Sequence, residues 1–410
     1  MENRHSQSAL EARSVAAGTL PDPTVSVGLA NLPVDTFDID QEPMTQITVG
    51  VTQIIPRGDS LKLKREQLQV ASREYPQQRR ERRARTAVTV GRLWLDAYKV
   101  QESITLIEND RPLFIQLVDV AEASYSSALG RTRQQDIVRA QLELTSLDDR
   151  LTRLRQMQEM IMENLSEWVS GYFHEQYRMA TPSLSYSDGS GLHLPRKLPD
   201  IAMLNKPLFT ADQEADPQAL YVYFADHPAV LSIEQKIKAS ELGVEVARQS
   251  YKPQWGVNAG YGYRDDPSSG DRADFISMGL SFDLPVFTKN RQDKEVLAAV
   301  SQTEAVKTTK WSLVRKMIAG FEKNRVQLKR LRERQTLYQD QLLPQMHEQA
   351  EASLTAYTND DGDFAEVVRA RIAELNARIE ALEIDVEIQK TIIGLNYYFM
   401  ETPENIIAGT

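Results

Sequence analysis

Carboxylates gather in one short stretch of this chain, and they are the side chains best suited to attract an ion. Residues 359–364 read NDDGDF, which brings Asp360, Asp361 and Asp363 close together in the sequence. A ring of like charge at a constriction favours cations, and crowding raises the pKa of some of its carboxyl groups. A lone acidic turn is commonly only solvated surface, because aspartate suits turn backbones. The stretch becomes a candidate ion site only if several copies meet around one axis.

Other reactive side chains show no catalytic or metal-binding spacing. The histidines are scattered, and neither a phosphate loop nor a G-x-S-x-G motif occurs. Met157, Met160 and Met162 could suggest a soft metal ion, but such clusters more often serve helix packing. We therefore expect no enzyme, no cofactor and no metal site. The five histidines are His5, His174, His193, His227 and His347.

Composition indicates long, surface-rich helices rather than compact layers. The 410 residues have a mean hydropathy of −0.44, 26% charged residues and only 19 glycines. The net charge of −10 disfavours nucleic acid as a partner. Cysteine is absent, which excludes disulfides and thiolate metal sites. The sequence contains no run of 18 apolar residues, so we expect no transmembrane helix.

The elements that position the acidic turn belong to a duplicated unit. The prolines of IIPRGD and DLPVFT, Pro56 and Pro285, lie 229 residues apart, and AEAS and VRA recur at spacings of 229 and 230. Each copy starts with alternating apolar and polar residues that predict a β-hairpin. Each then continues into apolar residues spaced three and four apart, which predict long paired helices. Pro112 and Pro344 are expected to bend these helices.

We predict the following domain boundaries. The first repeat spans 1–180, with a hairpin at about 23–55 and long helices at about 57–175. A Ser-, Gly- and Pro-rich linker, 181–227, forms an equatorial region. The second repeat spans 228–400, with a helix at 228–251, a hairpin at about 254–284 and long helices at about 286–398, before a tail at 401–410.

One face of the predicted strands is apolar and the other is small or polar, as in a transmembrane β-strand. A soluble hairpin packed on a helix has the same alternation, so this alternative stays open. Four strands cannot close a membrane barrel, because open edges are not tolerated in lipid. Three chains would supply 12 strands, enough for a hollow pore, with Pro56 and Pro285 at the exits from barrel to helices. The residues expected to face lipid are Val25, Val27, Leu29, Ile47, Val49, Val51, Trp255, Val257, Tyr261, Ile276, Met278, Leu280 and Phe282.

With these features the chain resembles the TolC-type outer-membrane efflux proteins. The resemblance rests on the ordered set of PDPTVSVGLANLP, GRTRQQDIVRAQLEL (130–144), GDFAEVVRARIAEL (362–375), the hairpins and the proline exits. It implies an α+β membrane protein: a homotrimer with a 12-stranded outer-membrane barrel on an α-helical periplasmic barrel. It further implies a passive exit duct for a tripartite efflux or type I secretion system. The implied partners are a periplasmic adaptor and an inner-membrane pump of the resistance-nodulation-division type, in multidrug or heavy-metal resistance.

The resemblance also places the periplasmic entrance at the turns between the paired helices. There Asp360, Asp361 and Asp363 could pair with Arg131 and Arg133 by opposite charge and hold the entrance closed. An ordinary solvated turn competes with this interpretation. The residues expected to contact the adaptor are Leu129, Gly130, Thr132, Asn359 and Gly362.

Two expectations concern location and the competing function. The first residues, MENRHSQSALEARSVAAGTL, lack the apolar core of an export signal, and trimming at the N-terminus would explain this. The alternative function is a soluble periplasmic coiled-coil scaffold, which would not need detergent.

Overall fold

The computed structural model describes residues 2–126, 133–169, 197–204, 216–264, 273–359 and 362–399. The chain folds as two compact units, and each takes segments from both halves of the sequence. The first unit comprises residues 1–81 and 225–316, and the second comprises 82–224 and 317–410. The predicted repeats are copies within the sequence, whereas these units are defined by contacts in the fold. The repeat boundaries therefore stay a prediction.

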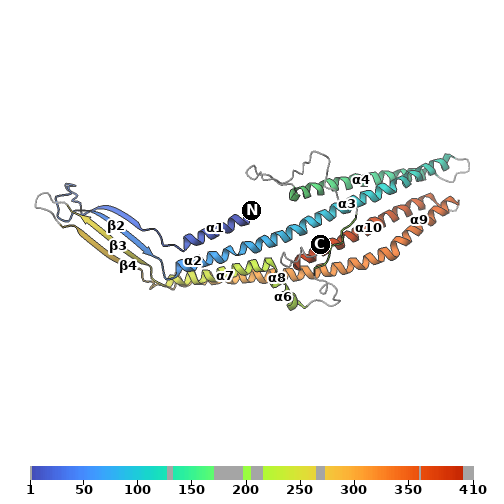
Figure 1. The fold of residues 1–410 in the computed structure, drawn as a ribbon. Coiled ribbons are helices and arrows are strands. Elements are labelled where there is room, and N and C mark those ends of the chain that lie inside the picture. The colour runs from blue at the N-terminus through green and yellow to red at the C-terminus, as the bar shows by residue number, and fades with distance from the viewer. Residues whose placement is uncertain are drawn as a thin grey trace. The chain divides into compact units, whose positions relative to one another are not determined.

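The first unit holds a four-stranded antiparallel sheet (Figure 1). Its strands are β1 (Thr24–Ala30), β2 (Gln46–Ile55), β3 (Trp255–Tyr263) and β4 (Phe275–Phe282), in that order across the sheet. The central pair, β2 and β3, joins a hairpin from each half of the sequence. Strands β1 and β4 are therefore the two edges of the sheet among the described residues.

Three helices of the first unit pack together, and short turns connect the strands to the helical segments. Helix α2 (Ser60–Ser72) contacts both α1 (Glu2–Ala17) and α7 (Pro228–Arg248). Pro56 directly follows β2, and Pro285 lies three residues beyond β4. Gly58 has φ +47°, and the side chains of Gln249 and Lys252 occupy the space that a Cβ would need there. Glycine at this turn therefore permits both the left-handed backbone and the close contact with the end of α7.

Long helices build the second unit. Helix α3 (Glu74–Ser126) and helix α8 (Gln292–Leu337) each begin in the first unit and continue into the second. Within the second unit α4 (Gln134–Val169) runs along α3, and α9 (Leu343–Thr358) runs along α10 (Phe364–Asn396) (Figure 1). Helix α6 (Pro217–Ala225) lies in the stretch expected to be a linker. Among the described residues, every helix is either too short or too polar to serve as a transmembrane helix.

The hydrophobic core of the second unit joins three of these helices. Val100, Ile104 and Ile107 of α3 share one buried cluster with residues of the other two helices. The other members include Leu147 and Leu151 of α4 and Val367, Val368 and Leu375 of α10. The three-and-four spacing thus predicted the buried faces correctly, although α10 packs on the first helix pair as well as on its own partner α9. Burying a side chain of this size contributes about 1.5–3 kcal/mol.

The two interior prolines are accommodated differently. Pro112 lies inside α3, which stays helical on both sides of it. Pro344 lies in the first turn of α9, and a π-helical turn at Tyr338–Leu342 directly precedes it. Proline has no N–H to donate to the carbonyl four residues earlier, so a local change of hydrogen-bond pattern is expected there.

Candidate functional site

One face of the sheet is apolar from edge to edge. The register aligns Val25, Val51, Ala259 and Met278 in one row, and Val27, Val49, Tyr261 and Ile276 in the next. Val27 is 74% exposed and Met278 is 84% exposed, and every residue expected to face lipid is solvent-exposed. An apolar surface that covers four strands without interruption is unusual for a protein surface in water, and it marks a surface with a partner.

The opposite face of the same sheet is small and polar. Ser26, Gly50, Gly260 and Ser277 form one row of this face. A Cβ on Gly50 would lie 2.8 Å from the Ser26 hydroxyl oxygen, and a Cβ on Gly260 would lie 2.9 Å from the Ser277 hydroxyl oxygen. Small residues opposite polar ones leave a groove of about 500 Å³ along this face. The sheet therefore has one apolar face and one face of small and polar residues.

Polar contacts fix the backbone where the strands end in the first unit. The Asp283 carboxylate accepts a hydrogen bond of 2.7 Å from the backbone N–H of Gln254 and forms an ion pair with Arg57. The Arg57 guanidinium also donates to the backbone carbonyl of Lys252 at 2.9 Å. These contacts tie together the segments that follow β2, precede β3 and follow β4.

The acidic turn lies between α9 and α10. The Asp363 carboxylate accepts a hydrogen bond from the backbone N–H of Ala365 and caps α10. Asn359 ends α9, and a Cβ on Gly362 would lie 2.6 Å from the backbone nitrogen of Tyr357. Glycine at 362 therefore lets the turn fold back closely on the last turn of α9.

The opposing turn is only partly described. The backbone N–H of Arg133 donates to the Asp136 carboxylate at 2.8 Å, which caps α4. No ion pair links Arg133 to Asp363 among the residues that the structure describes. The other candidates at the two turns lie outside the described residues, namely Leu129, Gly130, Arg131, Thr132, Asp360 and Asp361. Their roles, and those of Asn359, Gly362 and Asp363 at an entrance, stay predictions.

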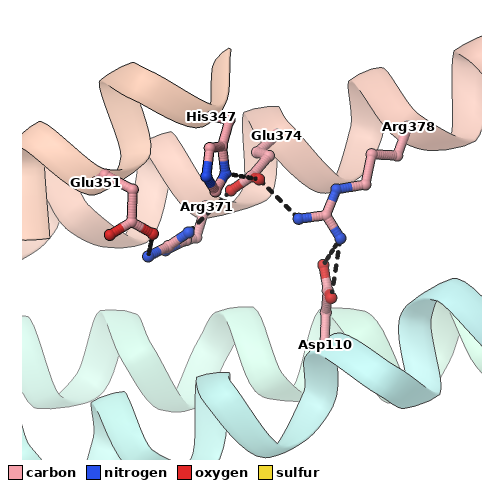
Figure 2. A network of polar contacts seen from close by, with 6 residues as sticks. All are labelled: Asp110, His347, Glu351, Arg371, Glu374 and Arg378. Carbon is pink, nitrogen blue, oxygen red and sulfur yellow. Dashed lines mark hydrogen bonds and ion pairs between the residues drawn. The ribbon is translucent and has the colours of Figure 1, made fainter. Parts of the chain in front are cut away.

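A network of charged side chains links α3, α9 and α10 in the second unit (Figure 2). Its centre is Glu374 on α10, whose side chain is only 4% exposed. Glu374 accepts hydrogen bonds from Arg378 at 2.6 Å and from Arg371 at 3.0 Å, and its Oε1 lies 2.8 Å from Nδ1 of His347 on α9.

The two arginines carry the network to the neighbouring helices. Arg378 reaches Asp110 of α3 at 3.2 Å, and Arg371 reaches Glu351 of α9 at 2.6 Å. Burial of Glu374 disfavours its charged form, but hydrogen bonds from Arg378, His347 and Arg371 outweigh this effect and lower the pKa of Glu374. The network therefore holds an ionised carboxylate inside the helix bundle.

Further polar contacts connect the first helix pair to α10. Lys390 of α10 binds Asp96 of α3 at 2.9 Å, and Lys99 of α3 binds Glu383 of α10 at 3.1 Å. Arg150 of α4 donates to the side-chain oxygen of Asn376 at 2.6 Å. The two helix pairs are thus joined along α10 by ionic contacts as well as by the apolar cluster.

A signal for the Glu374 network exists in the sequence. Arg371, Glu374 and Arg378 are spaced three and four apart, as apolar core residues are. Charged residues at this spacing more commonly form a solvated helix face. The spacing shows that they share one face of α10, but not that this face is covered by α9 and α3.

Comparison with known proteins shows a fold rather than a sequence relationship. No protein-family model matches the sequence, and no curated protein is similar to it. The solved structures that are similar include the CmeC outer membrane channel of Campylobacter jejuni, at a TM-score of 0.74 and 11% identity, covering 98% of this chain and 84% of that one. The outer membrane protein VceC of Vibrio cholerae has a TM-score of 0.72 at 11% identity, covering 97% and 91%.

A third structure is that of the open state of the MtrE outer membrane channel of Neisseria gonorrhoeae. Its TM-score is 0.68 at 13% identity, and the match covers 97% of this chain and 85% of that one. The match extends over nearly all of this chain in each case, so it includes the sheet as well as the long helices. The chain therefore has the fold of the TolC-type outer-membrane channels.

Proposed function

We propose that this protein is the outer-membrane exit duct of a tripartite efflux or type I secretion system. The observation that carries the proposal is the sheet, with a continuous apolar face, a small polar face and two free edges. Such a sheet fits a barrel wall between lipid and water, where no edge can be left unpaired. A soluble coiled-coil scaffold would have no use for the apolar face, so the sheet disfavours that alternative.

The number of strands favours a trimer. Two copies would give eight strands, whose interior side chains fill, whereas three copies give 12 strands and leave an open interior. In this arrangement β4 of one copy pairs with β1 of the next, and all edges disappear. The long helices of the three copies would continue the duct through the periplasm to an adaptor and an inner-membrane pump of the resistance-nodulation-division type.

The oligomeric state tests this proposal directly. We expect protein purified in detergent to have the mass of a trimer by light scattering with the detergent contribution subtracted. We also expect aggregation when the detergent is removed, because the apolar face is then exposed to water. A monomer or dimer at high concentration, or a soluble monomer without detergent, would exclude the 12-stranded duct.

We also propose that the acidic turn lies at the periplasmic entrance, near the adaptor. Threefold symmetry would place the carboxylates of Asp360, Asp361 and Asp363 from three copies around one axis. A ring of carboxylates attracts cations, and it would bind divalent cations more strongly than monovalent ones because the attraction grows with charge. Conduction would then be cation-selective and partly blocked by divalent cations.

Single-channel recording in planar bilayers checks this second prediction. The double variant Asp360→Asn and Asp363→Asn should lower cation selectivity and weaken the divalent block. Asparagine is as good a helix cap as aspartate, so the cap of α10 at position 363 should survive. Arg131→Ser should raise conductance if that arginine helps hold the entrance closed. The control is Asp149→Asn, an exposed position on α4 away from the turn. Unchanged selectivity, block and conductance in all these variants would mean that the turns are ordinary surface.

A further inference from the structure

The second unit contains a polar cavity that is open to solvent. It lies between α3, α8 and α10, close to the end of α10, and has a volume of about 520 Å³. Arg92 and Asp96 line it from α3, and Lys323 lines it from α8. The remaining lining residues are Gly320, Asn324, Gln327, Glu387, Lys390, Thr391 and Tyr398. Almost all of these side chains are charged or polar.

Some charged side chains of the cavity pair with one another and others do not. Its two carboxylates, Asp96 and Glu387, both bind Lys390, at 2.9 and 2.7 Å. Arg92 and Lys323 form no hydrogen bond or ion pair with any residue in the described ranges. Three cationic side chains and two carboxylates line the cavity, so its net charge is +1. Its free capacity is for a negatively charged group.

Two helix glycines leave space for polar side chains beside this cavity, because they have no Cβ. A Cβ on Gly394 of α10 would lie 2.7 Å from a terminal nitrogen of Arg92 and 3.2 Å from the amide nitrogen of Asn324. A Cβ on Gly320 of α8 would collide with the Tyr398 hydroxyl. Glycine inside a helix is destabilising relative to alanine. Its presence at both positions is explained by the close approach of these donors.

The tyrosine is held in place and remains a donor. Tyr398 packs with Phe224 and Phe321 at ring-centroid distances of 5.6 and 6.0 Å. Burial raises the pKa of Tyr398, although the nearby Arg92 opposes this effect. The hydroxyl therefore keeps its proton at neutral pH and can donate it in a hydrogen bond. A fixed neutral donor beside two cationic side chains can orient an anionic ligand.

From this geometry we infer that the cavity binds a small multivalent oxyanion, carrying phosphate or carboxylate groups. Arg92 supplies paired donors of the geometry that both groups accept, and Lys323 supplies a second positive charge. Asn324 and Tyr398 supply neutral donors. The inference does not depend on the proposed duct function, because it rests on the second unit alone.

Calorimetric titration of the detergent-purified protein tests the inference. Inorganic phosphate tests a free ion, citrate tests carboxylates on a small molecule, and sodium chloride at equal ionic strength measures unspecific screening. We expect saturable binding of phosphate, citrate or both, and none of chloride. In the double variant Arg92→Gln and Lys323→Gln the affinity should fall at least about tenfold, as loss of charge-assisted hydrogen bonds implies.

The matched control is Arg330→Gln on the same helix as Lys323, because Arg330 is 73% exposed and does not line the cavity. It should bind like the wild type, and all variants should keep the wild-type circular dichroism spectrum and oligomer mass. Equal affinity of the double variant and the wild type would overturn the inference, as would phosphate and citrate behaving like chloride. A third outcome also overturns the inference: the wild type binds no oxyanion, and the double variant no longer forms the wild-type oligomer. The cavity would then receive an acidic group from a neighbouring copy.

Discussion

Met278→Arg is expected to reduce the free energy of folding into lipid by about 2–4 kcal/mol, the range for a cation near the midplane of a membrane barrel. Met278 lies in the middle of β4, in the same row as Val25, Val51 and Ala259 on the apolar face. An arginine there would have to leave water for hydrocarbon or distort the lipid around it. Denaturant titration of the protein in phospholipid vesicles measures the change.

Ser277→Arg is the matched control, since the two positions are neighbours on the same edge strand and face opposite sides of the sheet. Its guanidinium should stay in water, so folding into vesicles should change little while single-channel conductance changes. Equal losses of folding at both positions would contradict the assignment of one face to lipid and the other to water. An arginine tolerated at 278 would favour an ordinary hairpin covered by protein.

The parts of the fold that repeat in the sequence were the parts that could be predicted. Alternation at Ile276, Met278 and Leu280 indicated a strand with one apolar face, and the structure places these residues on one exposed face of β4. The spacing of apolar residues three and four apart indicated buried helix faces, and Val100, Ile104 and Ile107, which have this spacing, lie in the core cluster. Local periodicity decides such features, so no knowledge of distant contacts was needed.

Features that depend on three helices at once could not be predicted in this way. The sequence of α10 by itself offers no reason to bury Glu374, so local spacing predicts a solvated position for it. Its burial follows from His347 on α9 and Asp110 on α3, which are far away in the sequence. The π-helical turn before Pro344 was missed because a proline predicts a bend without saying which hydrogen bonds change. The aspartates of the acidic turn are the opposite case. The sequence identifies these residues, but only an assembly of several copies could bring them together around one axis.

The second large effect is expected at the charged network of α10. Glu374→Gln keeps the shape of the side chain but removes its charge, which leaves Arg371 and Arg378 without their shared carboxylate. Breaking a buried ion pair from one side costs about 3–5 kcal/mol. Arg371 is only 10% exposed, but Arg378 is 37% exposed and His347 is 60% exposed, so water can replace part of the interaction. We therefore expect a loss near the lower end of that range, about 3 kcal/mol.

The pH dependence separates this ionic effect from a simple packing defect. The pKa of Glu374 is lower in the folded protein than its ordinary value of 4.5, so its charge stabilises the fold above that pH. The contribution decreases as the pH falls below 4.5 and is lost once the folded protein binds the proton. The stability gap between the wild type and Glu374→Gln, measured by thermal or denaturant unfolding, should therefore be full at pH 7 and narrow steadily on acidification. Glu366→Gln is the control, because Glu366 pairs with Arg369 at the exposed surface of the same helix and should change stability by less than about 1 kcal/mol. A gap that stays constant from pH 7 to below 4.5, or a Glu374 variant as stable as the Glu366 variant, would show that the network contributes no ionic stabilisation to the helix bundle.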